Sequence, residues 1–318
     1  MRSSNVVPLA LALALAAGAL SGCGKSGDAV SPLAPGGPAS NSDQAEIASV
    51  LASVPEVVDE SAFATADETS LGGGPAGATA AIEPLRFWRT ITEVERHYDF
   101  QFSDPDPNGM PTTAIVTLDK VLSGSFNILT GPAAVNLTDA NLRNVVRKPL
   151  RDDWRRRLLL KRVPDLRPEL RPRWRVAAIS GVKVTSRVPA AVPHTRILSL
   201  RIQSGPQDTT VTDPLQFFRL RRVLQLQPRE SVMLTVTTES DNDVVVLLHA
   251  GLRFPFVNNG DNTYSAKWAM PGPGMGVRHL GVNALSKGTL YDDQAPYNSD
   301  AWILPYAMPP TMLAEYMP

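Results

Sequence analysis

Cysteine is almost absent from this chain, which has one cysteine, Cys23, in 318 residues. A single cysteine excludes a disulfide within the chain, so the folded part must be stabilised by the burial of apolar side chains. The composition permits this, because 43% of the residues are hydrophobic. A chain of this length can supply more than one hydrophobic core.

Histidine is also scarce, and the motifs of common catalytic sites are missing. The four histidines are His97, His194, His249 and His279. None has the H-E-x-x-H spacing of a zinc site, although His249 and His279 lie in strands expected to be neighbours. The G-x-S-x-G elbow and the Gly-rich phosphate loop are absent. Side chains of adjacent residues diverge in a strand, so Asp152-Asp153 and Asp292-Asp293 do not make a catalytic carboxylate pair. We therefore predict that the protein is not an enzyme and expect no catalytic residues, cofactor or metal.

Two acidic segments have a partial likeness to calcium sites. Residues 104–109 (DPDPNG) match the first half of a calcium loop, but position 12 of that loop is Ile115 instead of a bidentate glutamate. Two prolines also stiffen the segment, so we expect a hairpin turn there. For Glu239, Asp241 and Asp243 we expect a solvated acidic turn, with weak calcium binding as the alternative.

The N-terminal residues have the pattern of an exported protein. Arg2 precedes an apolar stretch over 6–20, which is shorter than the ~20 residues that span a bilayer as a helix. We therefore predict a signal peptide over 1–22. Leu20-Ser21-Gly22-Cys23 resembles the bacterial lipobox, and this resemblance implies cleavage before Cys23 and fatty acylation, including palmitate, at that residue. Gly24 stands where some Gram-negative bacteria place an inner-membrane retention signal, Asp, so the resemblance implies the outer membrane.

A flexible tether with one short helix is expected after the lipobox. Residues 23–82 are rich in Gly, Ser, Pro and Ala, which bury too little apolar surface to become ordered. Within them a helix is predicted over 43–53, with Asp43 as the N-cap and Glu46 three residues later. The apolar face of this helix would consist of Ile47, Val50 and Leu51. We expect this face to dock on the folded part; a helix that stays mobile is the alternative.

Alternating apolar and polar residues predict an antiparallel β domain over 83–190. Residues 148–163 (KPLRDDWRRRLLLKRV) are interpreted as a strand whose basic side chains cover apolar surface with their stems. The order of elements, with 84–102 followed by 148–163 and 173–186, is similar to the cone-shaped nuclear-transport-factor-2 and cystatin-like folds. That resemblance implies a curved sheet that encloses an apolar pocket, and a plain β-sandwich is the alternative.

A second β region is predicted over 195–310, followed by a tail over 311–318. Here NNGDNTYSAKWAMP and GVRHLGVNAL resemble bacterial immunoglobulin-like repeats. The resemblance implies an antiparallel sandwich with Tyr264 and Trp268 in its core, in a class of domains used for spacing, adhesion or binding. An inserted segment over 213–228 departs from the pattern, and we interpret it as a short helix.

The net charge of zero hides a strong asymmetry along the chain. From Arg143 to Arg175 there are thirteen basic and four acidic residues, whereas from Lys25 to Glu83 there are nine acidic and one basic. The candidate binding residues in the basic block are Arg155, Arg156, Arg157, Lys161 and Arg162. They would meet anionic lipid, polysaccharide or another envelope protein, and nucleic acid is not expected for an exported protein. In the alternative, the arginines line a solvent face and pair with the nearby acids Asp152, Asp153, Asp165 and Glu169.

Together these features predict a mainly β protein, with an antiparallel sheet domain and a minor helix followed by an immunoglobulin-like β-sandwich. The expected function is that of a lipid-anchored protein of the bacterial cell envelope, in the outer membrane, with a non-catalytic binding or structural role. One alternative is a ligand carrier with a pocket in the first domain. Another is an envelope hydrolase.

Overall fold

The computed structural model is mainly β, with antiparallel sheets and two helices among the residues that it describes. These residues are 41–53, 69–70, 82–130, 145–163, 173–219, 224–226, 230–249, 252–269 and 277–307. The predicted signal peptide, the lipobox, most of the predicted tether and the 311–318 tail lie outside the described residues. The mainly β class predicted from the sequence is confirmed.

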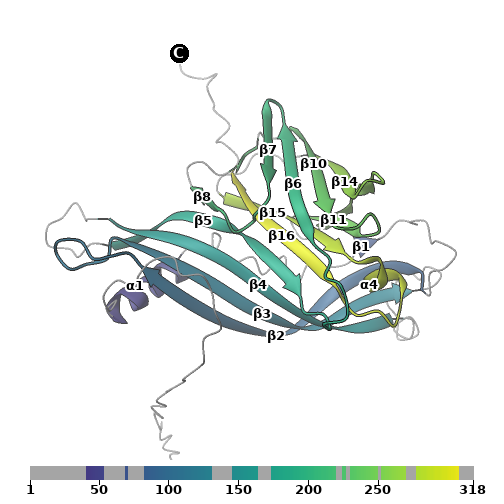
Figure 1. Cartoon of the computed structure of the whole chain (residues 1–318), viewed down its shortest axis with the longest axis horizontal. Coiled ribbons are helices and arrows are strands. Elements are labelled where there is room, and N and C mark those ends of the chain that lie inside the picture. Colours follow the sequence, from purple (N-terminus) through teal and green to yellow (C-terminus); the bar gives the residue numbers. More distant parts are fainter. Residues whose placement is uncertain are drawn as a thin grey trace, which may run out of the picture. The chain divides into compact units, whose positions relative to one another are not determined.

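The larger sheet has eleven strands, in the order β1-β2-β3-β4-β5-β16-β15-β11-β12, with β8 beside β5 and β9 beside β16. Its strands are β1 (Thr69–Ser70), β2 (Pro84–Phe102), β3 (Thr113–Thr130), β4 (Val145–Val163), β5 (Arg173–Ser186), β8 (Phe217–Arg219), β9 (Leu224–Gln225), β11 (Val244–His249), β12 (Leu252–Pro255), β15 (Val277–Leu285) and β16 (Ser299–Ala307). Figure 1 shows β2 to β5 as long, curved strands that lie side by side.

The second sheet has five strands, in the order β13-β14-β10-β6-β7. They are β6 (Ile197–Ser204), β7 (Gln207–Val211), β10 (Ser231–Thr238), β13 (Val257–Asn258) and β14 (Thr263–Ala269). This sheet shares one hydrophobic core with β11, β15 and β16 of the larger sheet. We call the side of the larger sheet that faces this core its outer face, and the opposite side its inner face. Tyr264 and Trp268 are buried in the shared core, as predicted.

The ranges expected as separate domains, 83–190 and 195–310, are joined within one sheet. β16 pairs with β15 on one side and with β5 on the other. The physical reason is that β16 is apolar on both faces: Trp302 packs in the outer core, and Ile303 packs with Val182 on the inner face.

The larger sheet also curls, so that β12 contacts β1 at the opposite edge. The guanidinium group of Arg253 in β12 lies over the ring of Phe87 in β2, with 5.0 Å between Cζ and the ring centroid. A bulge in β2 near Ile91 bends the strand opposite Gly124. A Cβ atom at Gly124 would lie 1.9 Å from the carbonyl oxygen of Thr90, so only glycine permits this close approach.

Two local predictions need correction. The segment over 213–228 is not a short helix where the structure describes it, because its described residues contribute β8 and β9 to the larger sheet. These pieces pair with β5 and β16, and such pairing overrides a weak helical pattern. The other correction concerns Asp43, which is not an N-cap, since helix α1 (Asn41–Ala52) begins two residues earlier.

The docking of α1 is confirmed, with Ile47 and Leu51 buried among inner-face residues. The carboxylate of Asp43 accepts a hydrogen bond from Nε1 of Trp174 at 3.0 Å and forms an ion pair with Arg162. Both charged side chains are only 11% exposed. The Arg162 guanidinium also lies over the Trp174 ring, 4.7 Å from its centroid. Asp43 therefore links the helix to β4 and β5.

Replacement of Asp43 tests this link. Asp43→Ala leaves two donors of Arg162 and Trp174 without their acceptor, and it should lower the free energy of unfolding by about 2–4 kcal/mol. Urea denaturation measures this loss. Ser49→Ala, at an exposed position of the same helix, is the control and should change stability little. Equal effects of the two substitutions would contradict the assigned role of Asp43.

Candidate functional site

The predicted basic residues of β4 do not form one patch, because successive side chains of a strand point to opposite faces. Arg155, Arg157 and Lys161 lie on the outer face, and Arg156 and Arg162 lie on the inner face. Arg162 is the partner of Asp43 and of Trp174. Only the outer three are therefore available to a partner on the exposed side of the sheet.

Arg156 is completely buried and holds the interior of the sheet together. Its Nε and Nη2 donate to the carbonyl oxygen of Ser180, each at 3.2 Å, and Nη2 lies 3.2 Å from Nε2 of His279. Burial, together with the nearby charge of Arg156, lowers the pKa of His279 to about 3. His279 is therefore a neutral partner of Arg156 at ordinary pH.

Lys148 is a second buried member of the basic block. Its ammonium group donates to the carbonyl oxygens of Gly288 and Asp292, at the end of helix α4 (Lys287–Tyr291). Burial lowers the pKa of Lys148 to about 8, and Asp292 and Asp293 oppose this shift. The charge of Lys148 is thus used inside the fold.

Two arginines of the outer face pair with acids, but of these acids the alternative interpretation named only Asp153, and its partner Arg187 lies outside the basic block over 143–175. Arg155 pairs with Asp119 and Arg187 pairs with Asp153, each with a shortest distance of 2.6 Å. Asp152 does not pair with an arginine of its own strand; it faces Arg89 inside the sheet. The other two expected acids, Asp165 and Glu169, lie outside the described residues.

A polar network crosses the interior between β2, β4 and β16. Arg89 donates to the hydroxyl of Tyr297 at 2.6 Å and lies 3.4 Å from the carboxylate of Asp152. The Tyr297 hydroxyl also contacts Asp152 and Ser299, at 3.3 and 2.6 Å. Burial raises the pKa of Asp152 and of Tyr297, and Arg89 opposes both shifts. The network has the form of a buried ion pair supported by hydroxyl groups.

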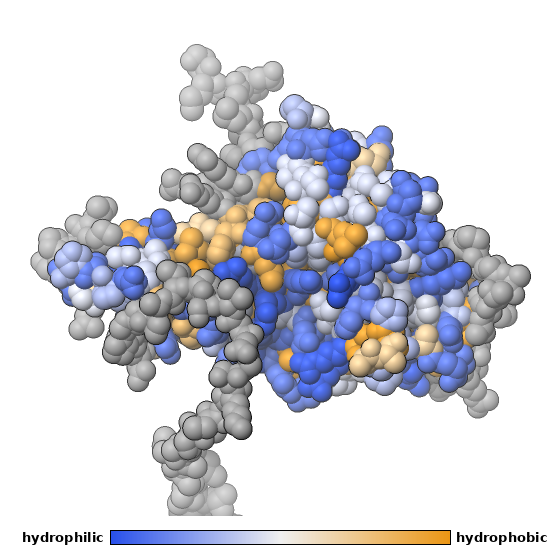
Figure 2. Space-filling model, in the orientation of Figure 1, coloured by the Kyte–Doolittle hydropathy of each residue, from blue (hydrophilic) through white to orange (hydrophobic). Residues whose placement is uncertain are grey.

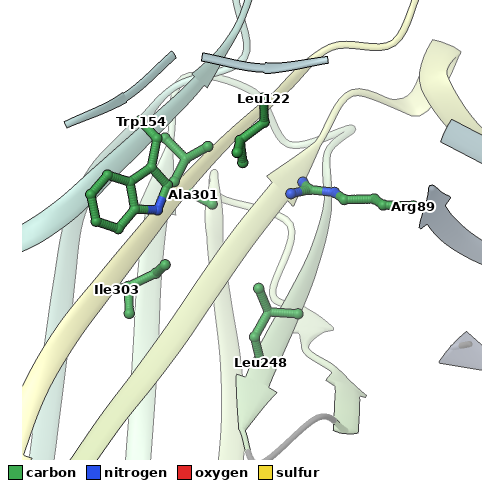
Figure 3. A pocket seen from close by; sticks show the side chains of 7 residues that line it. Arg89, Leu122, Trp154, Leu248, Ala301 and Ile303 are labelled. Carbon is green, nitrogen blue, oxygen red and sulfur yellow. The ribbon is translucent and has the colours of Figure 1, made fainter. Parts of the chain in front are cut away.

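An apolar void borders this network. It is lined by Arg89, Leu122, Trp154, Val184, Leu248, Ala301 and Ile303. Figure 3 shows Arg89 extending into this space, with Trp154, Ile303 and Leu248 on its other sides. The cavity measures about 10 Å³, which is room for about one water molecule. This void does not provide the pocket that a ligand carrier would need.

A groove on the surface is larger, at about 670 Å³, within the range of ligand sites. It is lined by Met233, Leu247, His249, Phe254, Pro255, Val257, Ser265, Ala266, Lys267, Trp268 and Ala269. Met233, Phe254 and Val257 are 39%, 43% and 68% exposed, respectively. These lining residues include no acid, and Lys267 is their only lysine or arginine. Sequence reasoning missed this groove, although the apolar run FPFV at 254–257 was a signal for it.

His249 lies among the aromatic residues beside this groove. Its Nε2 is 2.9 Å from the Tyr306 hydroxyl, and its ring centroid is 4.5 Å from that of Trp268. Burial, and to a smaller extent Arg278, lowers the pKa of His249. His279 lies on the inner face beside Arg156, so the two histidines expected to approach each other lie on opposite faces of the sheet.

The acidic segments do not assemble a metal site among the described residues, which contain no group of three or more His, Cys, Asp or Glu placed to hold an ion. The DPDPNG segment forms the β2–β3 hairpin turn, in which Asp106 accepts from the backbone N–H groups of Asn108 and Met110. In the second acidic group, Asp243 is not solvated as expected. It is buried beside exposed Asp241, and burial raises its pKa to about 6.

Comparison with known proteins gives no match: no family model, no curated protein and no solved structure matches this chain. In the part of the chain that the structure describes, no helix has the length and apolarity needed to cross a membrane. On the face of the molecule shown in Figure 2, hydrophilic residues cover most of the described surface, and apolar residues form separate patches.

The pairing of Arg156 with His279 predicts a pH dependence of stability. Between pH 6.5 and 3 the unfolded chain binds a proton at His279 that the folded chain does not, so stability falls as the pH falls through this window. The slope from this group is at most about 1.4 kcal/mol per pH unit. His279→Gln should remove it, as urea unfolding at pH 7 and pH 4.5 would show.

His97→Gln, at an exposed position of β2, is the matched control and should keep the wild-type dependence. The assignment fails if the wild type and His279→Gln lose the same stability between the two pH values.

Proposed function

We propose that this protein is a lipid-anchored component of the bacterial cell envelope with a non-catalytic binding role. In this proposal an apolar segment of another envelope protein occupies the surface groove. The observation that carries the proposal is the exposure of Met233, Phe254 and Val257 around one concave site. Apolar side chains gathered at one exposed site are typical of binding surfaces.

The chemistry of the groove supports binding over catalysis. Its polar side chains are Ser265, Lys267, His249 and the indole of Trp268. His249 faces the Tyr306 hydroxyl and the Trp268 ring, and no serine, cysteine or carboxylate is within hydrogen-bond distance of it among the described contacts. General-base catalysis requires a nucleophile or substrate proton within such reach.

The anchor part of the proposal rests on Leu20-Ser21-Gly22-Cys23 and on the apolar stretch before it. Several acyl chains on one residue bind a membrane far more firmly than a single chain, because each buried methylene contributes ~0.8 kcal/mol. A protein held in this way reaches partners within the envelope. The outer membrane is the proposed location, because Gly24 stands where an inner-membrane retention signal would have Asp.

Cys23→Ser tests the anchor. The wild-type protein should incorporate labelled palmitate and begin at Cys23, whereas Cys23→Ser should take up no label and retain residues 1–22. Metabolic labelling and mass spectrometry of the purified chain measure both properties. Ser26→Ala, just beyond the cleavage point, should behave as the wild type. Palmitate on the Cys23→Ser chain, or a mature chain that begins elsewhere, would refute the lipobox assignment.

A photo-crosslinking amino acid at position 257 tests the groove in living cells. It should yield a defined adduct with another envelope protein, and Phe254→Ser should abolish that adduct by removing the adjacent apolar surface. The matched control position is 198, where Leu198 is 46% exposed outside the groove. The binding role is contradicted if positions 257 and 198 give the same adducts or if position 257 gives none.

A further inference from the structure

The outer face of β4 and β5 carries cations directly opposite each other. Arg155 pairs in register with Lys183, and Lys161 pairs with Arg175. The N–H group of Arg187 donates to the carbonyl oxygen of Arg151 at 2.8 Å, which places these two arginines opposite each other as well. All six residues are exposed. We call these three pairs the basic row.

Such pairs are unfavourable in the free protein. Opposite residues of an antiparallel ladder have their Cβ atoms ~5 Å apart, and like charges at that separation destabilise the sheet. Asp119 and Asp153 offset part of the charge, through Arg155 and Arg187. The other four cations, Arg151, Lys161, Arg175 and Lys183, form no ion pair with a described residue.

The basic row is long and narrow. From residue 151 to residue 161 the strand advances ~33 Å, at ~3.3 Å per residue. On its β2 side the same face is acidic. Glu93 is opposite Ser123, and Ser123 is opposite Arg151, so Glu93 lies two strands from the row. Two strand spacings are ~10 Å.

This arrangement of charges favours a narrow anionic partner over a flat anionic surface. A flat anionic membrane would meet the acids Glu93, Glu95 and Asp99 of β2 together with the basic row. A thin chain laid along the strands would meet the six cations and a single acid among them, Asp153, which is already paired with Arg187. The described residues of β3, β4 and β5 also expose no large apolar side chain that would insert into a bilayer.

We propose that the basic row binds a linear anionic polysaccharide, whose regularly spaced acidic groups lie along β4 and β5 between the paired cations. The polymer would relieve the repulsion within each pair, and its many weak contacts would make binding strongly dependent on salt. This inference uses a surface separate from the groove and stands independently of the anchor and of the groove's partner.

The test uses the full-length protein in neutral detergent micelles and immobilised polygalacturonate, a linear polymer of uronic acids, with neutral dextran as the reference. Wild-type protein should bind polygalacturonate at low salt and not dextran, and binding should weaken by at least tenfold at physiological salt. The double variant Lys161→Gln/Arg175→Gln should bind at least tenfold more weakly than the wild type. Its melting temperature should equal or exceed that of the wild type, because a repulsive pair has been removed.

The control variant Arg196→Gln/Lys287→Gln removes the same charge at exposed positions outside the basic row and should bind within twofold of the wild type. Equal losses of affinity for polygalacturonate in the two variants would show that binding depends only on net charge, and this result would overturn the proposal. Absence of binding to polygalacturonate would also overturn it. The proposal would also be overturned if the protein bound micelles that contain phosphatidylglycerol and did not bind the polymer, since that result would assign the surface to lipid.

Discussion

The fold depends on the backbone pairing of β16 with β5. Residues 300–303 of β16 pair with 182–185 of β5, and the whole of β16 pairs with β15. This strand is therefore the junction through which both halves of the chain share one sheet. Because its side chains are buried on both faces, it supplies apolar surface to the outer core and the inner core at once. Without it, the two halves would each have an open strand edge, which favours association with other chains.

Local features of the fold were predictable, because the alternation of apolar and polar residues along a strand indicates which side chains are buried. Leu158 and Leu160 are buried and Leu159 is less so, as the period of two requires. The apolar face of α1 followed from helical spacing, and the core positions of Tyr264 and Trp268 followed from the resemblance to immunoglobulin-like repeats. Long-range pairing was not predictable, because nothing near residues 173–186 signals that their neighbour in the sheet lies at 299–307. The proposed boundary near residue 190 followed from sequence spacing alone.

The binding surfaces illustrate the same limit. The basic block was visible in the sequence, but its division between two faces depends on the strand assignment. The contact of Arg156 with His279 and the burial of Lys148 against α4 depend on partners more than 100 residues away. The groove combines residues of five strands, from Met233 to Ala269. Single exposed apolar residues are common in proteins, so their concentration around one site became evident only with the tertiary structure.

The docking of α1 has a mechanical consequence. Residues that precede Asn41 connect to the folded part through this helix, so a force applied from the N-terminal side reaches α1 first. One apolar helix face and the Asp43 ion pair resist that force, whereas β2, β3 and β4 behind it are joined by continuous ladders along most of their length. In a series of linked elements the weakest connection yields first. Under such a load, α1 would therefore separate from the sheet before the strand ladders of β2, β3 and β4 break.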